Sequence, residues 1–174
     1  MLQKMSNKVA TNKKGFTLIE VLLYITIAGT ILSVFSFFLY IMLSMQVKSQ
    51  VISEVEQQGI QVMQEITQAT KDAQGINSPT DGTASSLSLD VISSVKDPTI
   101  FSLSSGVIRI SEGGGIEINL TSGRIVASDF IVNNLSKAGT PGTIRIEFTL
   151  THVNPEGRNE YNYSKKFYGS ASIR

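Results

Sequence analysis

The sequence predicts an α+β protein in which one long N-terminal helix, transmembrane in its first half and amphipathic in its second, packs on an antiparallel β-sheet. Three observations favour this class. Residues 16–47 are apolar apart from a single charge, residues 52–73 carry apolar side chains at spacings of three and four, and apolar and polar residues alternate from residue 87 onward. The length of 174 residues allows one domain and a membrane anchor.

The charged residues are unevenly distributed along the chain. Residues 1–15 hold four of the 15 basic residues and none of the 14 acidic ones, so the rest of the chain is acidic on balance. Proteins that bind nucleic acids usually have a basic surface, and residues 16–174 have no excess of basic side chains to form one. We therefore expect no nucleic-acid partner. The absence of cysteine excludes a disulfide framework and a thiolate site.

The apolar segment is long enough to cross a membrane. Residues 21–43 would span about 35 Å as a helix, against a hydrocarbon thickness of about 30 Å. The run is also longer than the apolar region of a cleaved secretory signal. By the positive-inside rule, the lysines before it outnumber Lys48 after it and place the N-terminus in the cytoplasm and the C-terminal domain outside. Those lysines are Lys4, Lys8, Lys13 and Lys14.

Two residues at the start of this segment need an explanation. Glu20 is an acid within an apolar run, and such a residue near a helix centre costs about 2.5–3.5 kcal/mol. One alternative is that its side chain reaches the membrane–water interface. Gly15 stands just ahead of the run, where a residue without a side chain lets an extended backbone approach a protease closely. The alternative is a glycine that simply precedes a helix.

Residues 13–32, KKGFTLIEVLLYITIAGTIL, resemble the N-terminus of type IV prepilins and type II secretion pseudopilins. Gly15 corresponds to the last leader residue, Phe16 to the first mature residue and Glu20 to the fifth. Gly29 lies where the family often has a glycine in the helix. The resemblance implies that prepilin peptidase cleaves between Gly15 and Phe16 and methylates the new α-amino group of Phe16. It also implies a pilin-like fold.

The same resemblance implies assembly into a filament. After cleavage, Glu20 can pair with the Phe16 amine of a neighbouring subunit, and in a low-dielectric environment this pair fixes the register of the subunits. We therefore expect Phe16, Thr17, Glu20 and Gly29 to serve assembly. Small residues let neighbouring helices approach closely, and here they are Thr26, Ala28, Gly29, Thr30 and Ser33.

One helix is expected from Phe16 to Ala73, because no proline interrupts this range. Gly59 costs up to about 1 kcal/mol inside a helix and marks either a bend or a close approach. Beyond Lys48 the apolar stripe should cover the sheet. It consists of Ile52, Val55, Gly59, Val62, Met63, Ile66, Ala69 and Ala73.

The second half of the chain is expected to form a meandering antiparallel sheet with one face exposed to water. Residues 75–82 predict a turn that ends the helix, and His152 is expected beside a turn at a strand end. Strands are predicted at 87–91, 100–103, 107–110, 116–120, 125–132 with a break near Ala127–Ser128, and 144–150. The strands at 100–103 and 107–110 flank Ser104, Ser105 and Gly106 and are expected to form a hairpin. Residues 161–173 close the sheet with Tyr161, Tyr163, Phe167 and Ala171 facing inward.

These assignments divide the chain into four parts. Residues 1–15 form the leader, and residues 16–47 form the transmembrane and assembly half of the helix. Residues 48–74 form its amphipathic half. Residues 75–174 form the extracytoplasmic β domain.

The sequence contains no recognisable enzyme constellation. His152 is the only histidine and is expected to be solvent-exposed, a catalytic triad around it being the alternative. One histidine without cysteine does not predict zinc, and Glu112–Gly115 lacks the pattern of a phosphate-binding loop. Asp81, Asp90 and Asp97 do not have EF-hand spacing. We expect no cofactor and no metal.

Three functions remain open at this point. The favoured one is a minor pilin or pseudopilin of a type IV pilus, a type II secretion pseudopilus or a DNA-uptake machine, because a single small β domain with irregular loops favours a minor subunit. Residues 167–174 also resemble the ends of minor subunits of the J/W type. Its partners would be prepilin peptidase, other pilin subunits, the inner-membrane assembly platform and the lipid bilayer. Its location would be the cytoplasmic membrane and then the extracytoplasmic filament. The alternatives are a single-pass anchored binding or adhesion domain outside any filament, and a membrane-tethered hydrolase using His152.

Overall fold

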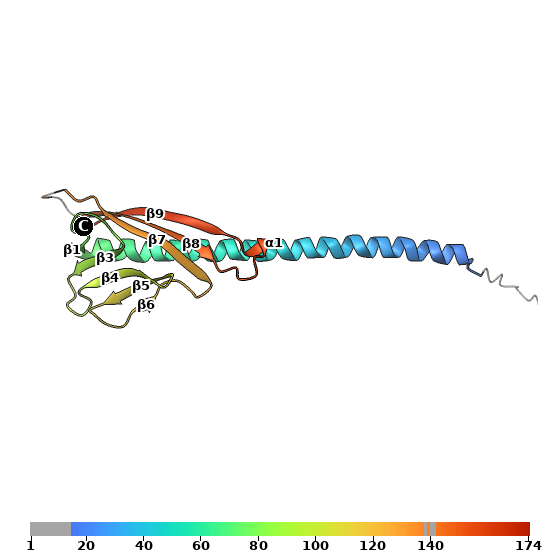
Figure 1. The fold of residues 1–174 in the computed structure, drawn as a ribbon, viewed down its shortest axis with the longest axis horizontal. Coiled ribbons are helices and arrows are strands. Elements are labelled where there is room, and N and C mark those ends of the chain that lie inside the picture. Colours follow the sequence, from blue (N-terminus) through green and yellow to red (C-terminus); the bar gives the residue numbers. More distant parts are fainter. Residues whose placement is uncertain (1–14, 138, 140–141) are drawn as a thin grey trace, which may run out of the picture. The chain divides into compact units, whose positions relative to one another are not determined.

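The computed structural model describes residues 15–137, 139 and 142–174. The predicted leader, with Lys4, Lys8, Lys13 and Lys14, lies outside the described residues except for Gly15. The chain divides into two compact units, of which the first ends at Leu43 and the second spans Ser44–Arg174. Figure 1 labels helix α1 and most of the strands.

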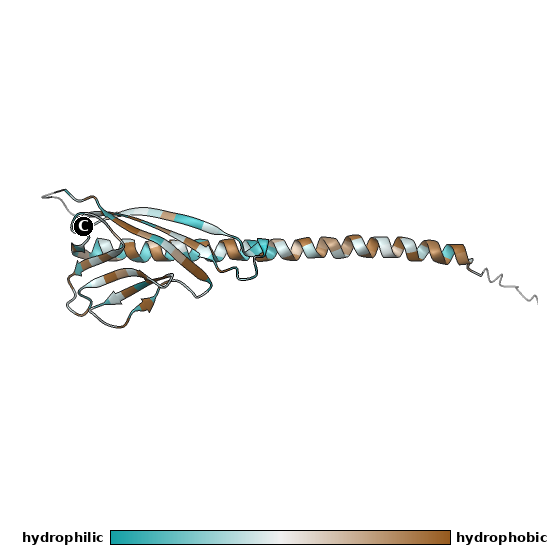
Figure 2. Cartoon of the chain, in the orientation of Figure 1, coloured by the Kyte–Doolittle hydropathy of each residue, from teal (hydrophilic) through white to brown (hydrophobic). Residues whose placement is uncertain are grey.

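Helix α1 spans Leu18–Asp72, which confirms the helix predicted from Phe16 to Ala73 to within two residues at each end. Its part in the first unit is largely apolar, as the hydropathy colouring shows (Figure 2), and most of its side chains are exposed in the isolated chain. By length and composition α1 is able to cross a membrane.

The apolar stripe of α1 in the second unit is shifted slightly from its prediction. Val55, Gly59, Val62 and Ile66 are buried as expected. Ile52 and Ala69 are only half-buried, and their places are taken by Val51 and Thr70. A pattern of apolar residues does not predict that the polar residue Thr70 is buried. Its burial is tolerated because its hydroxyl donates a hydrogen bond to the carbonyl oxygen of Ile66 at 2.7 Å.

The strands are antiparallel, as predicted, but they form two sheets rather than one. A strand's alternation shows which of its side chains share a face, and it does not show which strand is its neighbour. One sheet has the order β1-β3-β4-β5-β6, with bounds Ala73–Ser78, Ser86–Val91, Thr99–Ser104, Val107–Glu112 and Ile118–Asn119. The other has the order β2-β7-β8-β9, with bounds Gly82–Ala84, Ile125–Asn134, Thr143–His152 and Ser164–Ser172.

The predicted turn at residues 75–82 is wrong in its first half. Strand β1 starts directly after the helix and pairs with β3 through Ala73↔Val91 and Ile76↔Leu89. The turn begins only at Pro79. The segment lacks regular alternation because the pairing contains two register shifts, which explains why the sequence did not reveal a strand here.

Several local predictions in the sheets are confirmed. Strands β4 and β5 form the expected hairpin, and Ser105 and Gly106 both have positive φ, 51° and 75°, as a two-residue hairpin turn requires. The predicted break in β7 lies slightly later than Ala127–Ser128, at the register shift between Ser128 and Ile131. In β8 the alternating residues are all buried, namely Ile144, Ile146, Phe148 and Leu150.

The last strand, β9, is also close to its prediction. Ala171 is buried, and Tyr163 and Phe167 pack against the core. Tyr161 instead ends a short 3-10 helix, Asn159–Tyr161, ahead of the strand.

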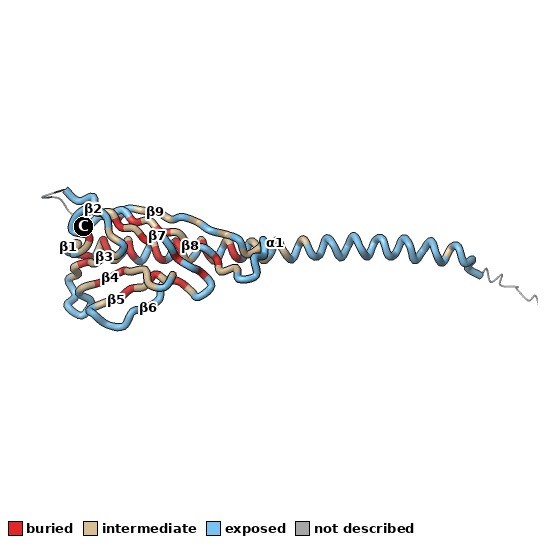
Figure 3. Tube along the Cα trace, in the orientation of Figure 1, coloured by how far each residue is buried: buried red, intermediate tan, exposed pale blue. Residues whose placement is uncertain are grey.

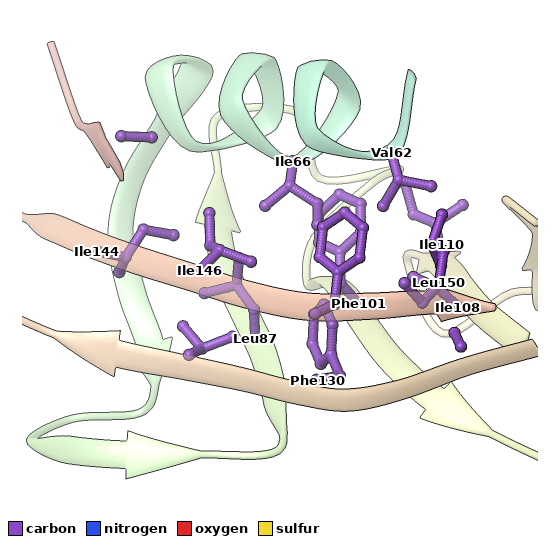
Figure 4. Close-up of a cluster of buried hydrophobic side chains, with 14 of the residues drawn as sticks. Val62, Ile66, Leu87, Phe101, Ile108, Ile110, Phe130, Ile144, Ile146 and Leu150 are labelled. Atoms are coloured by element: carbon purple, nitrogen blue, oxygen red, sulfur yellow. The ribbon is translucent and has the colours of Figure 1, made fainter. Parts of the chain in front are cut away.

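The hydrophobic core of the second unit lies between the amphipathic part of α1 and the two sheets, where the buried positions concentrate (Figure 3). Val62 and Ile66 point from the helix toward the sheet side chains, among them Phe101 and Leu150 (Figure 4). Each side chain of this kind contributes about 1.5–3 kcal/mol on full burial. The apolar stripe of α1 therefore covers the buried faces of the sheets and completes the core of this domain.

Candidate processing and assembly site

The GFTLIE motif lies at the point where α1 begins. Gly15, Phe16 and Thr17 have no regular secondary structure, and the helix starts at Leu18. The peptide bond between Gly15 and Phe16 thus lies outside the helix. Nothing comes within 4 Å of a Cβ built on Gly15. Because proteases bind substrates as extended backbone, this placement suits cleavage there.

Thr17 acts as the N-cap of α1. Its side-chain oxygen accepts a hydrogen bond from the backbone N–H of Glu20 at 3.4 Å, and its carbonyl oxygen accepts from the N–H groups of Glu20 and Val21 at 3.1 and 3.2 Å. Thr17 and Glu20 have the spacing of a capping box, in which the acid would reach back to the N–H of the cap residue. Glu20 also lies in the first turn, where the helix dipole favours a negative charge.

The side chain of Glu20 has a partner that the sequence prediction missed. The hydroxyl of Tyr24 donates a hydrogen bond to Oε1 of Glu20 at 3.3 Å. The ring of Tyr24 also meets the ring of Phe16 edge-on, with centroids 6.2 Å apart and an interplanar angle of 73°. Tyr24 therefore contacts both members of the pair expected between subunits. The signal was the four-residue spacing of residues 16, 20 and 24, which places them on one face of the chain.

The remaining predicted assembly residue, Gly29, lies nine positions beyond Glu20 and does not contact it in this structure. Nothing lies within 4 Å of a Cβ built on Gly29, so the helix surface there is open. Its carbonyl oxygen accepts a hydrogen bond from the Ser33 hydroxyl at 2.9 Å. An open glycine on an apolar helix permits close approach of another helix.

Four hydroxyl residues of the apolar segment are satisfied within their own helix. Thr26, Thr30 and Ser36 donate to the carbonyl oxygen four residues earlier at 2.8 Å, as Ser33 does at 2.9 Å. Lipid offers no hydrogen-bond partners, so this internal pairing lowers the cost of placing the segment in a membrane. The acid Glu20 is then the one charged residue that the segment has to accommodate.

The prediction that His152 is solvent-exposed is wrong. Only 8% of the residue is accessible, because its ring stacks on Tyr161 with centroids 5.6 Å apart. Its Nδ1 lies 2.9 Å from the carbonyl oxygen of Val153, and its Nε2 lies 3.8 Å from Oε2 of Glu54. The sequence places His152 beside a turn, but the chain after that turn folds back over it.

The surroundings of His152 do not assemble a catalytic triad. Among the described residues, its ion-pair, hydrogen-bond and ring partners are a carboxylate, a backbone carbonyl and an aromatic ring, with no serine or threonine hydroxyl. A surface pocket of about 310 Å³ beside it is lined by Arg124, Arg158 and Tyr161 among others. The residues that the structure describes include no group of three or more His, Asp or Glu side chains able to hold a metal ion.

The charged side chains of the β domain pair along its surface. Lys165 donates to Glu56 at 2.7 Å, a contact that lowers the pKa of the Glu56 carboxyl and raises the pKa of Lys165. Lys166 and Arg145 contact Glu147 at 2.7 and 2.8 Å, and the hydrogen bond from Lys166 is the main reason why the pKa of Glu147 is lowered. These pairs tie β9 to its neighbours and do not converge on a common cavity.

Comparison with known proteins bears on the N-terminal segment. Residues 10–36 match the family model described as the prokaryotic N-terminal methylation motif. The chain matches no curated protein and no solved structure. The matched residues include the whole GFTLIE segment and Gly29, and they run from the predicted leader into α1.

The motif and the fold agree with each other. One long N-terminal helix on antiparallel sheets is the arrangement expected for a pilin-like fold, and an apolar N-terminal helix suits membrane anchoring. The proteins for which this motif is typical are structural rather than enzymatic, and they are processed by a peptidase. At its N-terminus this chain carries the prokaryotic N-terminal methylation motif that is characteristic of the type IV prepilin and pseudopilin family.

Proposed function

We propose that the chain is a minor pilin or pseudopilin subunit. Prepilin peptidase cleaves it after Gly15 and methylates the α-amino group of Phe16, and the mature chain is assembled into a type IV pilus or a type II secretion-like filament. The observation that carries this proposal is the methylation motif at residues 10–36, in which the Gly15–Phe16 bond lies two residues ahead of the start of α1.

The four parts of the chain then have separate tasks. Residues 1–15 are the leader that the peptidase removes, and residues 16–47 anchor the subunit before assembly and pack against other helices after it. Residues 48–74 close the core of the β domain. Residues 75–174 form the part outside the membrane.

The proposed orientation follows from charge. The lysines of the leader stay in the cytoplasm, and Lys48 follows the apolar segment on the opposite side. The subunit thus waits in the cytoplasmic membrane with its β domain outside. Its partners there are the peptidase, other pilin subunits and the inner-membrane assembly platform.

The chemistry of assembly centres on Phe16 and Glu20. Cleavage frees an α-amino group, which is largely cationic at neutral pH, and methylation keeps that charge. Glu20 of a neighbouring subunit is a carboxylate of opposite sign near the same end of the helix. A misplaced subunit would leave both charges unpaired in an apolar environment, so the pair selects the correct register.

Processing by the peptidase provides the test. The full-length chain is co-expressed with a prepilin peptidase, and its intact mass is measured for loss of residues 1–15 and gain of one methyl group. We expect the wild type to be shortened, Gly15→Ala to be shortened in part, and Gly15→Leu to remain uncut because a bulky side chain blocks close approach to the backbone. Unimpaired maturation of Gly15→Leu would contradict the proposed cleavage site. A wild type that stays uncut would favour the membrane-anchored binding domain.

A further inference from the structure

Tyr24 and Glu20 form a hydrogen bond within the apolar part of a single helix. A carboxylate within an apolar segment needs a donor, since lipid provides none. The Tyr24 hydroxyl supplies one at 3.3 Å from the next turn of the same helix. This contact needs no second subunit and is therefore available as soon as the chain enters the membrane.

The Glu20 carboxylate is not used to cap the start of the helix and is therefore able to bond with Tyr24. Thr17 caps the N–H of Glu20 through its own side chain, which is one half of a capping box. The Glu20 carboxylate, which would complete the other half by turning back toward Thr17, is instead held by Tyr24 in the opposite direction along the helix.

Tyr24 also holds Phe16, the other member of the assembly pair. Their rings meet edge-on at 6.2 Å, and the two residues keep 72% and 53% of their surface exposed, Phe16 and Tyr24 respectively. An exposed pair of this kind can be separated when another helix packs on the same face.

We propose that Tyr24 is the internal partner of Glu20 in the unassembled subunit, and that assembly exchanges the Tyr24 hydroxyl for the Phe16 amine of a neighbouring subunit. The exchange rests on the proposed function, whereas the internal contact does not. An ammonium group brings a full positive charge where the phenol brings only a dipole, and in a low-dielectric environment that difference favours the amine.

Release of the phenol costs less than loss of a partner would cost the acid. A neutral hydroxyl without a partner in an apolar environment is much less unfavourable than an unpaired charge. Tyr24 is accordingly a positioning residue, which keeps Glu20 paired until the correct partner arrives.

The internal contact is tested by ¹⁹F NMR on the mature full chain in lipid nanodiscs, without partner subunits. 3-Fluorotyrosine is placed at position 24, and in a matched control at position 40, which lies much further along the same helix. We expect Glu20→Val to shift the resonance of the label at position 24 and to leave the label at position 40 unchanged. Glu20→Gln, which retains an acceptor oxygen, should shift the first resonance less. An unchanged resonance at position 24 in Glu20→Val would overturn the internal contact.

The exchange is tested by the same label in assembled filaments. We expect the resonance of the wild type to move on assembly toward its position in the unassembled Glu20→Val variant. A resonance that stays at the position of the unassembled wild type would overturn the exchange. Tyr24→Phe should be incorporated at least as well as the wild type, and a loss as large as that of Glu20→Val would count against the proposal.

The two tests also separate this inference from the proposed function. A wild-type chain that is neither cleaved nor incorporated would refute the proposed function and with it the exchange. The nanodisc measurement would still decide whether Tyr24 holds Glu20, because it uses the subunit alone.

Discussion

The ring of Phe167 on β9 lies directly over Gly59 on α1, so that a Cβ at position 59 would overlap the ring. Phe167 also stacks against Phe148, with ring centroids 5.4 Å apart. The converse holds one turn further along, where a Cβ on Gly169 would lie 2.8 Å from the sulfur of Met63. Helix α1 and strand β9 thus approach closely at two neighbouring contacts, and in each a glycine of one element lies opposite a large side chain of the other. Of the two sequence interpretations of Gly59, close approach is the correct one.

Replacing Gly59 by alanine should destabilise the β domain. Alanine is the better helix former by about 1 kcal/mol, but its methyl group would push Phe167 out of its stack on Phe148. Overpacking of a core costs about 1–3 kcal/mol, so we expect a net loss. Thermal unfolding of the full chain in detergent measures it. Gln57→Ala, at an exposed position of the same helix, is the control, and a raised melting temperature in Gly59→Ala would contradict the packing described.

Replacing Glu20 by valine should leave membrane insertion intact and impair assembly. Insertion becomes easier because a charged residue is removed from the apolar segment. In a filament the Phe16 amine of the neighbour would lose its partner, and truncating one side of a buried charge pair costs about 2–5 kcal/mol. We expect at least tenfold less subunit in sheared filaments at an equal amount in the membrane fraction. Glu65→Val, which removes an exposed acid of α1, is the control. Equal incorporation of the Glu20→Val variant would mean that Glu20 does not set the register.

The contact between Glu56 and Lys165 should make stability depend on acid pH. The hydrogen bond and charge of Lys165 lower the pKa of Glu56 in the folded state. A lowered pKa contributes stability above the ordinary glutamate pKa of about 4.3, and that contribution is lost as the pH falls through the folded-state value. The raised pKa of Lys165 acts at the other end, where its contribution is lost only as alkaline pH passes the folded-state value.

The measurement is the melting temperature of the wild type and of Glu56→Gln between pH 7 and pH 3. We expect the wild type to melt higher at neutral pH and the difference to close toward pH 3. The effect should be small, since the pair is exposed to solvent. A difference that is independent of pH would show that Glu56 contributes through packing and not through its charge.

Removing the charge of Lys48 should loosen the segment before β9. The ammonium group of Lys48 donates to the carbonyl oxygens of Asn159 and Asn162 at 3.0 and 3.1 Å and so anchors the 3-10 helix at residues 159–161. Hydrogen bonds to a charged group contribute about 1.5–3 kcal/mol. In Lys48→Met we expect amide hydrogen exchange in residues 159–163 to become roughly tenfold faster. Lys71→Met, near the end of the same helix, is the control, and unchanged exchange in Lys48→Met would refute the anchoring role.

The structure separates the features that short-range patterns predict from those that they do not. The β4–β5 hairpin followed from Ser105 and Gly106, and the buried face of β8 followed from strict alternation, because both depend on a few neighbouring residues. The GFTLIE motif could likewise be recognised from the sequence, because it is a run of consecutive residues. Tyr24 was missed although its spacing to Glu20 was visible, since spacing alone does not show which way a carboxylate turns.

By itself, the sequence determined the long helix with its apolar and amphipathic halves, most strands, and the methylation motif, all of which depend on periodicity or on adjacent residues. Only the tertiary structure decided that the strands form two sheets, that β1 follows the helix without a turn, and that His152 is buried beside Glu54. The same holds for Gly59 under Phe167. The last two contacts join residues about a hundred positions apart, and which distant surfaces meet depends on how side-chain volumes fill the whole core. No local pattern contains that information.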